Sequence, residues 1–229
     1  MILKPWEELP DFLRTDNVRP YYDILSRRRG RLLLKRGFDV AVSALMLVLL
    51  SPVFLVLAIA IKLDSPGPVF YRQVRVAQYG RHFRIFKFRS MDSDADKRGS
   101  LVTVSGDSRL TRVGHFIRNC RLDELSQLID IFRGTMTFVG PRPEVPKYVA
   151  AYTPEMLATL LLPAGVTSRA SILYKDEAEL LDAAGDVDAV YIHDVLPGKM
   201  RYNLEELKEF SFLSDIKTMF RTVFAGLGH

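Results

Sequence analysis

Two adjacent carboxylates, Asp123 and Glu124, stand in a segment that is otherwise rich in arginine, "TRVGHFIRNCRLDELSQLIDIFRGTMTFVGPRPE" (111–144). Adjacent acids repel each other unless cations lie nearby. An ionised carboxylate can act as a nucleophile, as aspartate does when it forms an acyl phosphate. A neighbouring carboxylate can help to bind a magnesium ion that neutralises a diphosphate. The pair therefore favours chemistry on a phosphorylated substrate.

The cations around the pair have the geometry to bind phosphate, because a guanidinium group can grip phosphate oxygens through two parallel hydrogen bonds. The four arginines nearest in sequence are Arg118, Arg121, Arg133 and Arg142. The stretch "GPRP" is a rigid extended turn, which we expect to hold Arg142 at a fixed angle. Positive charge should lower the pKa of both acids and keep them ionised, with a divalent cation offsetting their repulsion.

A simpler interpretation of Asp123 and Glu124 is a helix N-terminus, where carboxylates are favoured by the helix dipole. The sequence predicts two helices within 108–134, the second running from about Asp123 to Gly134. For an arbitrary Asp-Glu pair the capping interpretation would prevail. The density of arginines and the rigid turn favour a catalytic role instead.

The composition points to anionic partners. Lys and Arg number 32 against 27 Asp and Glu, a formal net charge of +5. Such a balance suits acidic lipid, a phosphorylated substrate or nucleic acid. No array of stacking aromatics and no recognition-helix pattern supports nucleic acid, so no such partner is expected. The single cysteine, Cys120, excludes an internal disulfide and a cysteine-based metal site.

One apolar run, Phe38–Leu63, is long enough to cross a bilayer as a helix, and it is uncharged from Val40 to Ile61. Basic residues flank both of its ends, whereas positive charge normally marks only the cytoplasmic side. Ser51 and Pro52 lie near its centre, where proline breaks a helix and the serine hydroxyl can satisfy a freed backbone group. These features predict a helix–break–helix hairpin over 35–63 that enters and leaves the same leaflet. A kinked full span and a buried core helix are the alternatives.

The secondary-structure elements that position the two acids predict a mostly helical protein of the α+β class. Residues 65–76 and 81–91 read as strands, and 210–228 as an amphipathic helix in a membrane interface. We expect three parts: an N-terminal surface segment (1–34), the re-entrant membrane hairpin (35–63) and a small cytoplasmic catalytic domain (64–229).

Five stretches together resemble the bacterial sugar transferases, which are monotopic phosphoglycosyl transferases. They are "KRGFDVAVSALMLVLLSP" (35–52), "DSPGPVFYRQVRV" (64–76), "FKFRSM" (86–91), the segment 111–144 and "FLSDIKTM" (212–219). The resemblance implies transfer of a sugar-1-phosphate from a UDP-sugar to polyprenol (undecaprenol) phosphate, with release of UMP. This reaction takes place on the cytoplasmic face of the bacterial inner membrane, in contact with its lipid, and initiates polysaccharide or glycoconjugate assembly.

The resemblance also implies roles for single residues. Asp123 attacks the β-phosphate and forms a covalent phosphosugar–aspartyl intermediate, and Glu124 binds Mg²⁺. The membrane helix breaks at Ser51-Pro52. The residues that match substrate-binding positions are Lys87, Arg118, Arg142, Lys175 and Asp215.

The chain departs from the family pattern in several places. Ala77 replaces a glycine, Ser126 replaces a proline, and "PAGVTSRAS" (163–171) stands where the family has "PGITGWAQ". By the resemblance, this last region helps to define the sugar or nucleotide pocket, so the sugar stays open. The oligomeric state stays open too, a homodimer included. Two other functions compete: a basic membrane-surface lipid-binding adaptor without catalysis, and a lipid-diphosphate hydrolase that uses the acids only as metal ligands.

Overall fold

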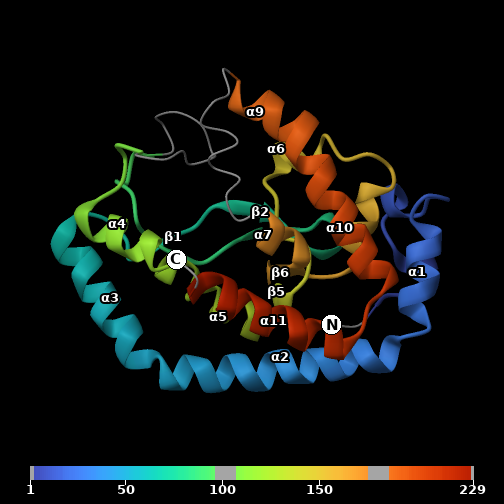
Figure 1. The fold of residues 1–229 in the computed structure, drawn as a ribbon, viewed down its shortest axis with the longest axis horizontal. Coiled ribbons are helices and arrows are strands. Elements are labelled where there is room, and N and C mark those ends of the chain that lie inside the picture. Colours follow the sequence, from blue (N-terminus) through green and yellow to red (C-terminus); the bar gives the residue numbers. More distant parts are fainter. Residues whose placement is uncertain (1–2, 96–106, 175–185, 228–229) are drawn as a thin grey trace.

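A computed structural model describes residues 3–95, 107–174 and 186–227 of the protein (Figure 1). Its described part is mostly helical, with three two-stranded sheets, as the sequence predicts. The helices are α1 (Arg19–Ser26), α2 (Arg29–Leu49), α3 (Ser51–Asp64), α4 (Arg112–Asn119), α5 (Gln127–Arg133), α6 (Pro146–Val149), α7 (Arg169–Leu173), α9 (Val187–Val190), α10 (Leu196–Lys208) and α11 (Phe212–Leu227). The strands are β1 (Phe70–Tyr71), β2 (Val74–Val76), β3 (His82–Arg84), β4 (Lys87–Phe88), β5 (Met136–Val139) and β6 (Ala164–Thr167).

The apolar run forms two helices, α2 and α3, which meet at a bend of 61°. Pro52 has no N–H group to donate to the carbonyl of Val48, four residues earlier. The Ser51 hydroxyl donates to that carbonyl instead, at 2.8 Å. The predicted helix break is therefore confirmed. Among the described residues no single helix is long and apolar enough to cross a bilayer, whereas this bent pair together meets both criteria.

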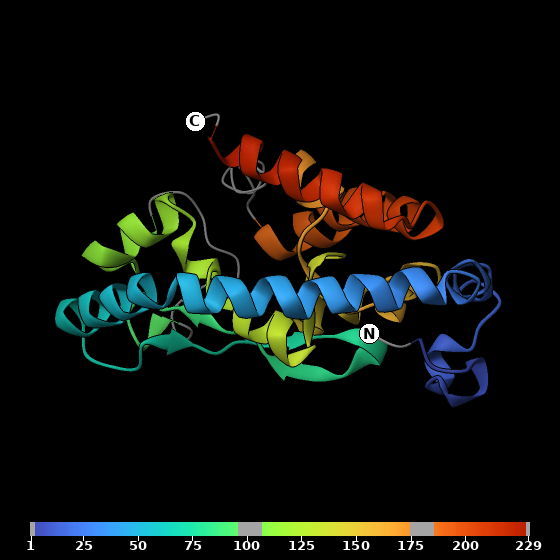
Figure 2. The ribbon, with the colours of Figure 1, turned by 90° about the horizontal axis from the view of Figure 1, so that it is seen from below.

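One face of α2 is polar and buried. Lys35, Asp39 and Ser43 recur at four-residue spacing and are almost fully buried. Lys35 forms an ion pair with Asp215 of α11, and Asp39 accepts a hydrogen bond of 2.7 Å from the hydroxyl of Thr137 in β5. These contacts hold α2 against α11 and β5, and Figures 1 and 2 show α11 running beside α2.

The remaining faces of α2, α3 and α11 carry exposed apolar side chains. Those on α2 and α3 include Leu45, Val48, Leu49, Leu55, Val56 and Ile59, and those on α11 include Leu213, Phe220, Val223 and Phe224. In Figure 1 the other elements lie inside the angle that α2 and α3 make, so the two helices border one side of the molecule. This is the reverse of an ordinary surface helix, which buries its apolar face and exposes a polar one.

The sheets are small, and two of them set up the site. Strand β1 pairs antiparallel with β4, with Tyr71 opposite Lys87, and β2 pairs antiparallel with β3. The single strand predicted over 81–91 is thus two strands that pair with different partners. Strand β5 runs parallel to β6, with Met136 opposite Ala164, and all four β5 residues are buried.

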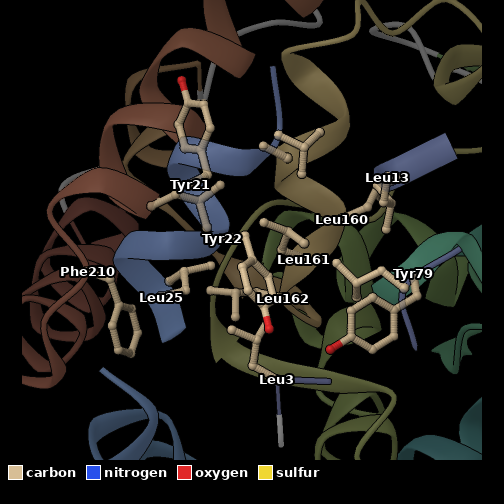
Figure 3. Close-up of a cluster of buried hydrophobic side chains, with 14 of the residues drawn as sticks. Leu3, Leu13, Tyr21, Tyr22, Leu25, Tyr79, Leu160, Leu161, Leu162 and Phe210 are labelled. Atoms are coloured by element: carbon tan, nitrogen blue, oxygen red, sulfur yellow. The ribbon is translucent and has the colours of Figure 1, made fainter. Parts of the chain in front are cut away.

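The N-terminal segment shares a core with distant parts of the chain. Leu3, Leu13 and Leu25 are buried together with Leu161 and Phe210, as Figure 3 shows. Helix α2 begins at Arg29, so the boundary predicted near residue 35 lies inside a helix. Through this shared core, the described residues of 1–34 pack on residues 158–162 and 204–210.

Candidate active site

The acid pair lies in a short 3₁₀ turn, Leu122–Glu124, between α4 and α5. Arg121, the residue before this turn, has a left-handed backbone with φ of 53°, a conformation that side-chain-bearing residues seldom adopt. The helix predicted to begin at about Asp123 begins as this 3₁₀ turn, and its α-helical part, α5, begins only at Gln127. Its end is confirmed at Gly134, which is also left-handed. The acids are therefore held by a turn and not by the first turn of α5.

Two cations from distant segments converge on Glu124. The Nη2 atom of Arg142, in the turn after β5, lies 2.5 Å from Oε1 of Glu124, and Nη1 lies 3.4 Å from Oε2. The Nζ atom of Lys87, in β4, lies 3.1 Å from the same Oε1 and 3.8 Å from Oδ2 of Asp123. The structure thus brings together four of the predicted site residues, Lys87, Asp123, Glu124 and Arg142.

The two acids have opposite pKa shifts. Burial raises the pKa of Glu124, but Arg142 and Lys87 outweigh it and hold that pKa well below the usual range. Burial also raises the pKa of Asp123; Lys87 lowers it and the charge of Glu124 raises it again, so the net shift is upward. The prediction that both acids have lowered pKa values is therefore correct for Glu124 and wrong for Asp123. The reason is that Arg142 contacts Glu124 in a forked geometry, which makes Glu124 the better compensated of the two.

A cavity of about 380 Å³ opens beside Asp123, and we call it the basic cavity. Its cationic lining residues are Arg72, Arg75, Lys87, Arg89, Arg109 and Arg118. Phe70, Tyr71 and Phe88 add aromatic surface. Cations and aromatic rings together suit an anionic ligand that carries a planar base.

A second cavity, of about 370 Å³, opens beside Glu124, and we call it the apolar cavity. Its apolar lining residues include Met46, Leu125, Leu128, Ile131, Phe138, Val166, Ile172 and Ala225. Its cations are Arg121, Arg142 and Lys199. The acid pair thus lies between two cavities of different character, with Asp123 lining one and Glu124 lining the other.

The remaining predicted site residues lie in different places. Arg118 lines the basic cavity with Asp123. Asp215 lines neither cavity and is paired with Lys35 at the buried face of α2. Lys175 falls outside the described residues. Ser51 and Pro52 form the break between α2 and α3.

The donor set at the acid pair fits a magnesium ion that is shared with a substrate. Mg²⁺ at phosphate sites is commonly held by one or two carboxylates together with phosphate oxygens and water. Glu124 and Asp123 offer such hard oxygen ligands side by side. Within the described parts of the chain, no group of three or more His, Cys, Asp or Glu side chains is placed to hold a metal by itself. A magnesium ion held here would need phosphate oxygens or water to complete its coordination.

Comparison with known proteins shows the family of the chain. Residues 30–229 match the sequence model of the family described as bacterial sugar transferase. The chain belongs to the bacterial sugar transferase family. A relative in Escherichia coli K12, UDP-glucose:undecaprenyl-phosphate glucose-1-phosphate transferase, is 35% identical over 213 residues, which cover 91% of this chain and 43% of that protein.

Other bacterial sugar transferases are similarly related. UDP-N-acetylgalactosamine-undecaprenyl-phosphate N-acetylgalactosaminephosphotransferase of Aeromonas hydrophila is 35% identical over 83% of this chain and 43% of its own length. A UDP-glucose:undecaprenyl-phosphate glucose-1-phosphate transferase of Caulobacter vibrioides is 34% identical over 83% of this chain and 68% of its own length. The chain thus spans less than half the length of the first two of these relatives.

The departures from the sugar transferase pattern lie in different places, and some of them line the apolar cavity. Ser126 is fully buried, and its hydroxyl donates to the carbonyl of Asp123 at 3.4 Å. In 163–171, Thr167 and Ser171 line the apolar cavity. Arg169 of the same stretch turns to α10, where its guanidinium lies 2.8 Å from Glu209 and 3.9 Å from Glu206.

Sequence reasoning missed one charged cluster of this sugar transferase. Lys199 of α10 is only 4% exposed and lines the apolar cavity. Its Nζ lies 3.0 Å from the hydroxyl of Tyr191, which donates to Oε1 of Glu144 at 2.7 Å. Glu144 stands in the "GPRPE" stretch, but Tyr191 and Lys199 are more than forty residues further on. No local pattern marks them, because only the tertiary fold brings them to the site.

Proposed function

We propose that the protein transfers a sugar-1-phosphate from a UDP-sugar to polyprenol phosphate at a bacterial membrane. The observation that carries the proposal is the acid pair, charge-compensated by Lys87 and Arg142 and placed between a basic and an apolar cavity. The related proteins are named for activities on undecaprenyl phosphate, which supports the same reaction class. A membrane-surface adaptor would not need a buried acid pair of this kind.

In the first step, an ionised Oδ atom of Asp123 attacks the β-phosphorus of the UDP-sugar. The bond from that phosphorus to the oxygen bridging the two phosphates breaks, and UMP leaves with the bridging oxygen and its electron pair. Lys87 and Arg118, which line the cavity of Asp123, bind the diphosphate. Glu124 would supply the protein ligand of Mg²⁺, which when bound neutralises charge on the diphosphate.

In the second step, a phosphate oxygen of polyprenol phosphate attacks the same phosphorus. The bond from phosphorus to Asp123 breaks, and its electron pair returns to the carboxylate. A phosphate monoester has a second pKa of about 6, so the acceptor is largely doubly ionised at neutral pH and needs no base to activate it. The products are the lipid-linked diphosphate sugar and the regenerated enzyme.

The membrane geometry is part of the proposal. The exposed apolar faces of α2, α3 and α11 would lie in lipid, with the hairpin entering and leaving one leaflet. The basic flanks of α2 and α3 would then remain on the cytoplasmic side, where nucleotide sugars are available. The related proteins act on glucose in some cases and on N-acetylgalactosamine in another, so the donor sugar is left open.

The test separates the first step from the second. The protein in detergent or vesicles is incubated with Mg²⁺ and a panel that begins with UDP-glucose and UDP-N-acetylgalactosamine, without acceptor. One donor should release UMP in a burst of about one equivalent, the signature of a covalent intermediate. Mass spectrometry should find a phosphosugar on the peptide that contains Asp123, and chelating Mg²⁺ should suppress both signals.

Asp123→Asn should give neither burst nor adduct, whereas Asp23→Asn, a change in α1 far along the chain, should give both. UMP that appears only after polyprenol phosphate is added would replace the two-step scheme by direct transfer. Hydrolysis of a lipid diphosphate, with no release of UMP from a UDP-sugar, would instead favour the lipid-diphosphate hydrolase.

A further inference from the structure

The backbone on the N-terminal side of Arg142 is held by β6. The N–H of Gly140 donates to the carbonyl of Thr167 at 2.9 Å. The N–H of Gly165 donates to the carbonyl of Pro141 at 2.8 Å. A Cβ atom at Gly165 would lie 2.2 Å from the backbone nitrogen of Gly140, so the two segments approach as closely as only glycine permits. Strand β6 thus fixes the two residues that precede Arg142.

The backbone that follows Arg142 is held by β2. The guanidinium of Arg75 donates to the carbonyl of Pro143 at 3.0 Å. The N–H of Val76 donates to the carbonyl of Glu144 at 2.9 Å. Only Pro143, with its fixed φ, separates Arg142 from Glu144. Whatever fixes Glu144 therefore also limits where the guanidinium of Arg142 can lie.

The side chain of Glu144 is anchored in a buried polar network. Its Oε1 atom accepts a hydrogen bond of 2.7 Å from the hydroxyl of Tyr191, and the ammonium of Lys199 lies 3.7 Å from the same oxygen. Lys199 also donates to that hydroxyl at 3.0 Å. All three side chains are almost fully buried. A buried carboxylate needs a hydrogen-bond donor and a compensating cation, and this network supplies both.

A local irregularity brings the two donors onto one face of their helix. Tyr191–Val195 is a π-helical turn that continues directly into α10. Tyr191 and Lys199 are eight residues apart, a spacing that in a regular α-helix turns two side chains about 80° away from each other. A π-turn takes up one extra residue, so the two align much as residues seven apart would. The π-turn therefore places both donors at Glu144.

We propose that Glu144 is a positioning residue for the transfer reaction and acts through Arg142. Tyr191 and Lys199 anchor the carboxylate of Glu144. Glu144 in turn fixes the turn from which Arg142 makes its forked contact with Glu124. Glu144 lines neither the basic nor the apolar cavity, so its effect on the reaction is indirect. The proposal rests on the proposed function.

A single hydroxyl group tests the proposal. Tyr191→Phe removes the hydrogen bond to Glu144 and keeps the aromatic ring. Tyr148→Phe is the matched control, because the ring of Tyr148 packs on that of Tyr191, with centroids 4.5 Å apart, whereas its hydroxyl donates to Asp188 at 2.6 Å. Each change is made in the wild-type protein and in the Arg142→Lys protein, which gives a double-mutant cycle.

The first readout is the rate of the UMP burst. Tyr191→Phe should slow the burst by on the order of tenfold in the wild type, since misplacing a positioned group by 1 Å can cost about a hundredfold. The UDP-sugar concentration that gives half the maximal rate should not change, because Arg142 does not line the basic cavity. In the Arg142→Lys protein, Tyr191→Phe should change the rate by less than about twofold, because the contact that it positions is already lost.

Three results would overturn the proposal. Equal slowing by Tyr191→Phe in both backgrounds would mean that the effect does not pass through Arg142. Equal slowing by Tyr148→Phe would show that loss of any buried hydroxyl in this region has the same effect. A higher half-saturating concentration of UDP-sugar would assign the network to donor binding.

The second readout is thermal melting in detergent, which needs no turnover. Tyr191→Phe should lower the melting temperature by on the order of 5 °C in the wild type, and by about half as much or less in Arg142→Lys. Tyr148→Phe should lower it equally in both backgrounds, and an equal loss for Tyr191→Phe would overturn the proposal.

The two readouts separate this proposal from the proposed function. If no UDP-sugar gives a UMP burst in the wild type, the proposed function fails, and the melting comparison still decides whether the network acts on Arg142. If Tyr191→Phe does not fold, Glu144→Gln takes its place in both readouts. It keeps an acceptor for Tyr191 but loses the charge beside Lys199, so the same loss of effect in Arg142→Lys is expected.

Discussion

The guanidinium of Arg142 contacts Glu124 through both terminal nitrogens, with Nη2 2.5 Å from Oε1 and Nη1 3.4 Å from Oε2. Arg142 stands between Pro141 and Pro143, whose fixed φ angles limit how far the backbone can move. The forked contact lowers the pKa of Glu124 despite its burial. Glu124 therefore stays ionised across the physiological pH range, as a metal ligand must.

Arg142→Lys should lower turnover by at least about tenfold, because a single ammonium cannot reproduce a two-nitrogen contact with a carboxylate. The Mg²⁺ concentration needed for half-maximal UMP release should rise as well, because Glu124 loses the two-nitrogen contact that holds its carboxylate in position. Steady-state kinetics at several Mg²⁺ concentrations measure both effects. Arg201→Lys, which alters an exposed pair with Glu205, is the control and should behave as the wild type. Wild-type kinetics for Arg142→Lys would remove Arg142 from the site.

Lys87→Met should move the acid limb of the pH–rate profile to higher pH. The reactive form of Asp123 is the carboxylate, so the first step slows as pH falls through the pKa of this group. Burial raises that pKa and Lys87 partly offsets the rise; without Lys87 the pKa goes up further. UMP burst rates across the pH range measure the shift, and Lys87→Arg should keep the limb near its original position. An acid limb that stays or moves downward in Lys87→Met would show that another group controls it.

The re-entrant hairpin predicts that both flanks of the apolar run share one side of the membrane. In a Cys120→Ser background, cysteines are placed singly at the exposed positions Asn17 and Ser108. A membrane-impermeant maleimide should label neither in sealed right-side-out vesicles and both in inverted vesicles. Labelling of one site from each side would establish a full span through α2 and α3.

The mostly buried Glu206 of α10 has a consequence for stability. Burial raises the pKa of Glu206 to about 7, although the backbone N–H of Arg169, which donates to Glu206 at 3.0 Å, and the charge of Arg169 both lower it. In the unfolded chain a glutamate has a pKa of about 4.3. Between these two pKa values Glu206 is protonated in the folded state and ionised in the unfolded chain. The free energy of unfolding therefore falls as the pH rises toward and through about 7.

Glu206→Gln cannot ionise, so it should lose less stability than the wild type between pH 5 and pH 8, by on the order of 2 kcal/mol. Melting temperatures in detergent at the two pH values give the comparison. Glu205→Gln, at a more exposed position of the same helix, should follow the wild type. The same pH dependence for Glu206→Gln and the wild type would mean that the Glu206 carboxyl ionises normally.

The features that the sequence predicts correctly are those with a local cause. The break at Ser51-Pro52 follows from the missing N–H of proline, and the end of α5 follows from Gly134. The convergence of Arg142 on Glu124 follows in part from the rigid turn, because the two are separated only by α5 and β5. Each of these depends on residues within one or two elements.

The features that cannot be predicted from the sequence depend on contacts between distant elements. The raised pKa of Asp123 depends on how deeply the 3₁₀ turn is buried. The left-handed backbone of Arg121, just before the 3₁₀ turn, is not indicated by its residue type. The assembly of Glu144, Tyr191 and Lys199 joins segments on either side of β6 and α7. Local sequence patterns do not predict the distances between such segments.

The buried polar face of α2 fixes the rotation of this helix about its own axis. Lys35, Asp39 and Ser43 face the body only because they recur every four residues, and each residue inserted into a helix rotates all later side chains by about 100°. Inserting one residue between Lys35 and Asp39 would swing Asp39 away from Thr137 and Ser43 away from the body, and would carry other side chains into their place. The apolar positions of this helix can exchange one aliphatic residue for another during evolution, whereas the number of residues between its polar anchors cannot change.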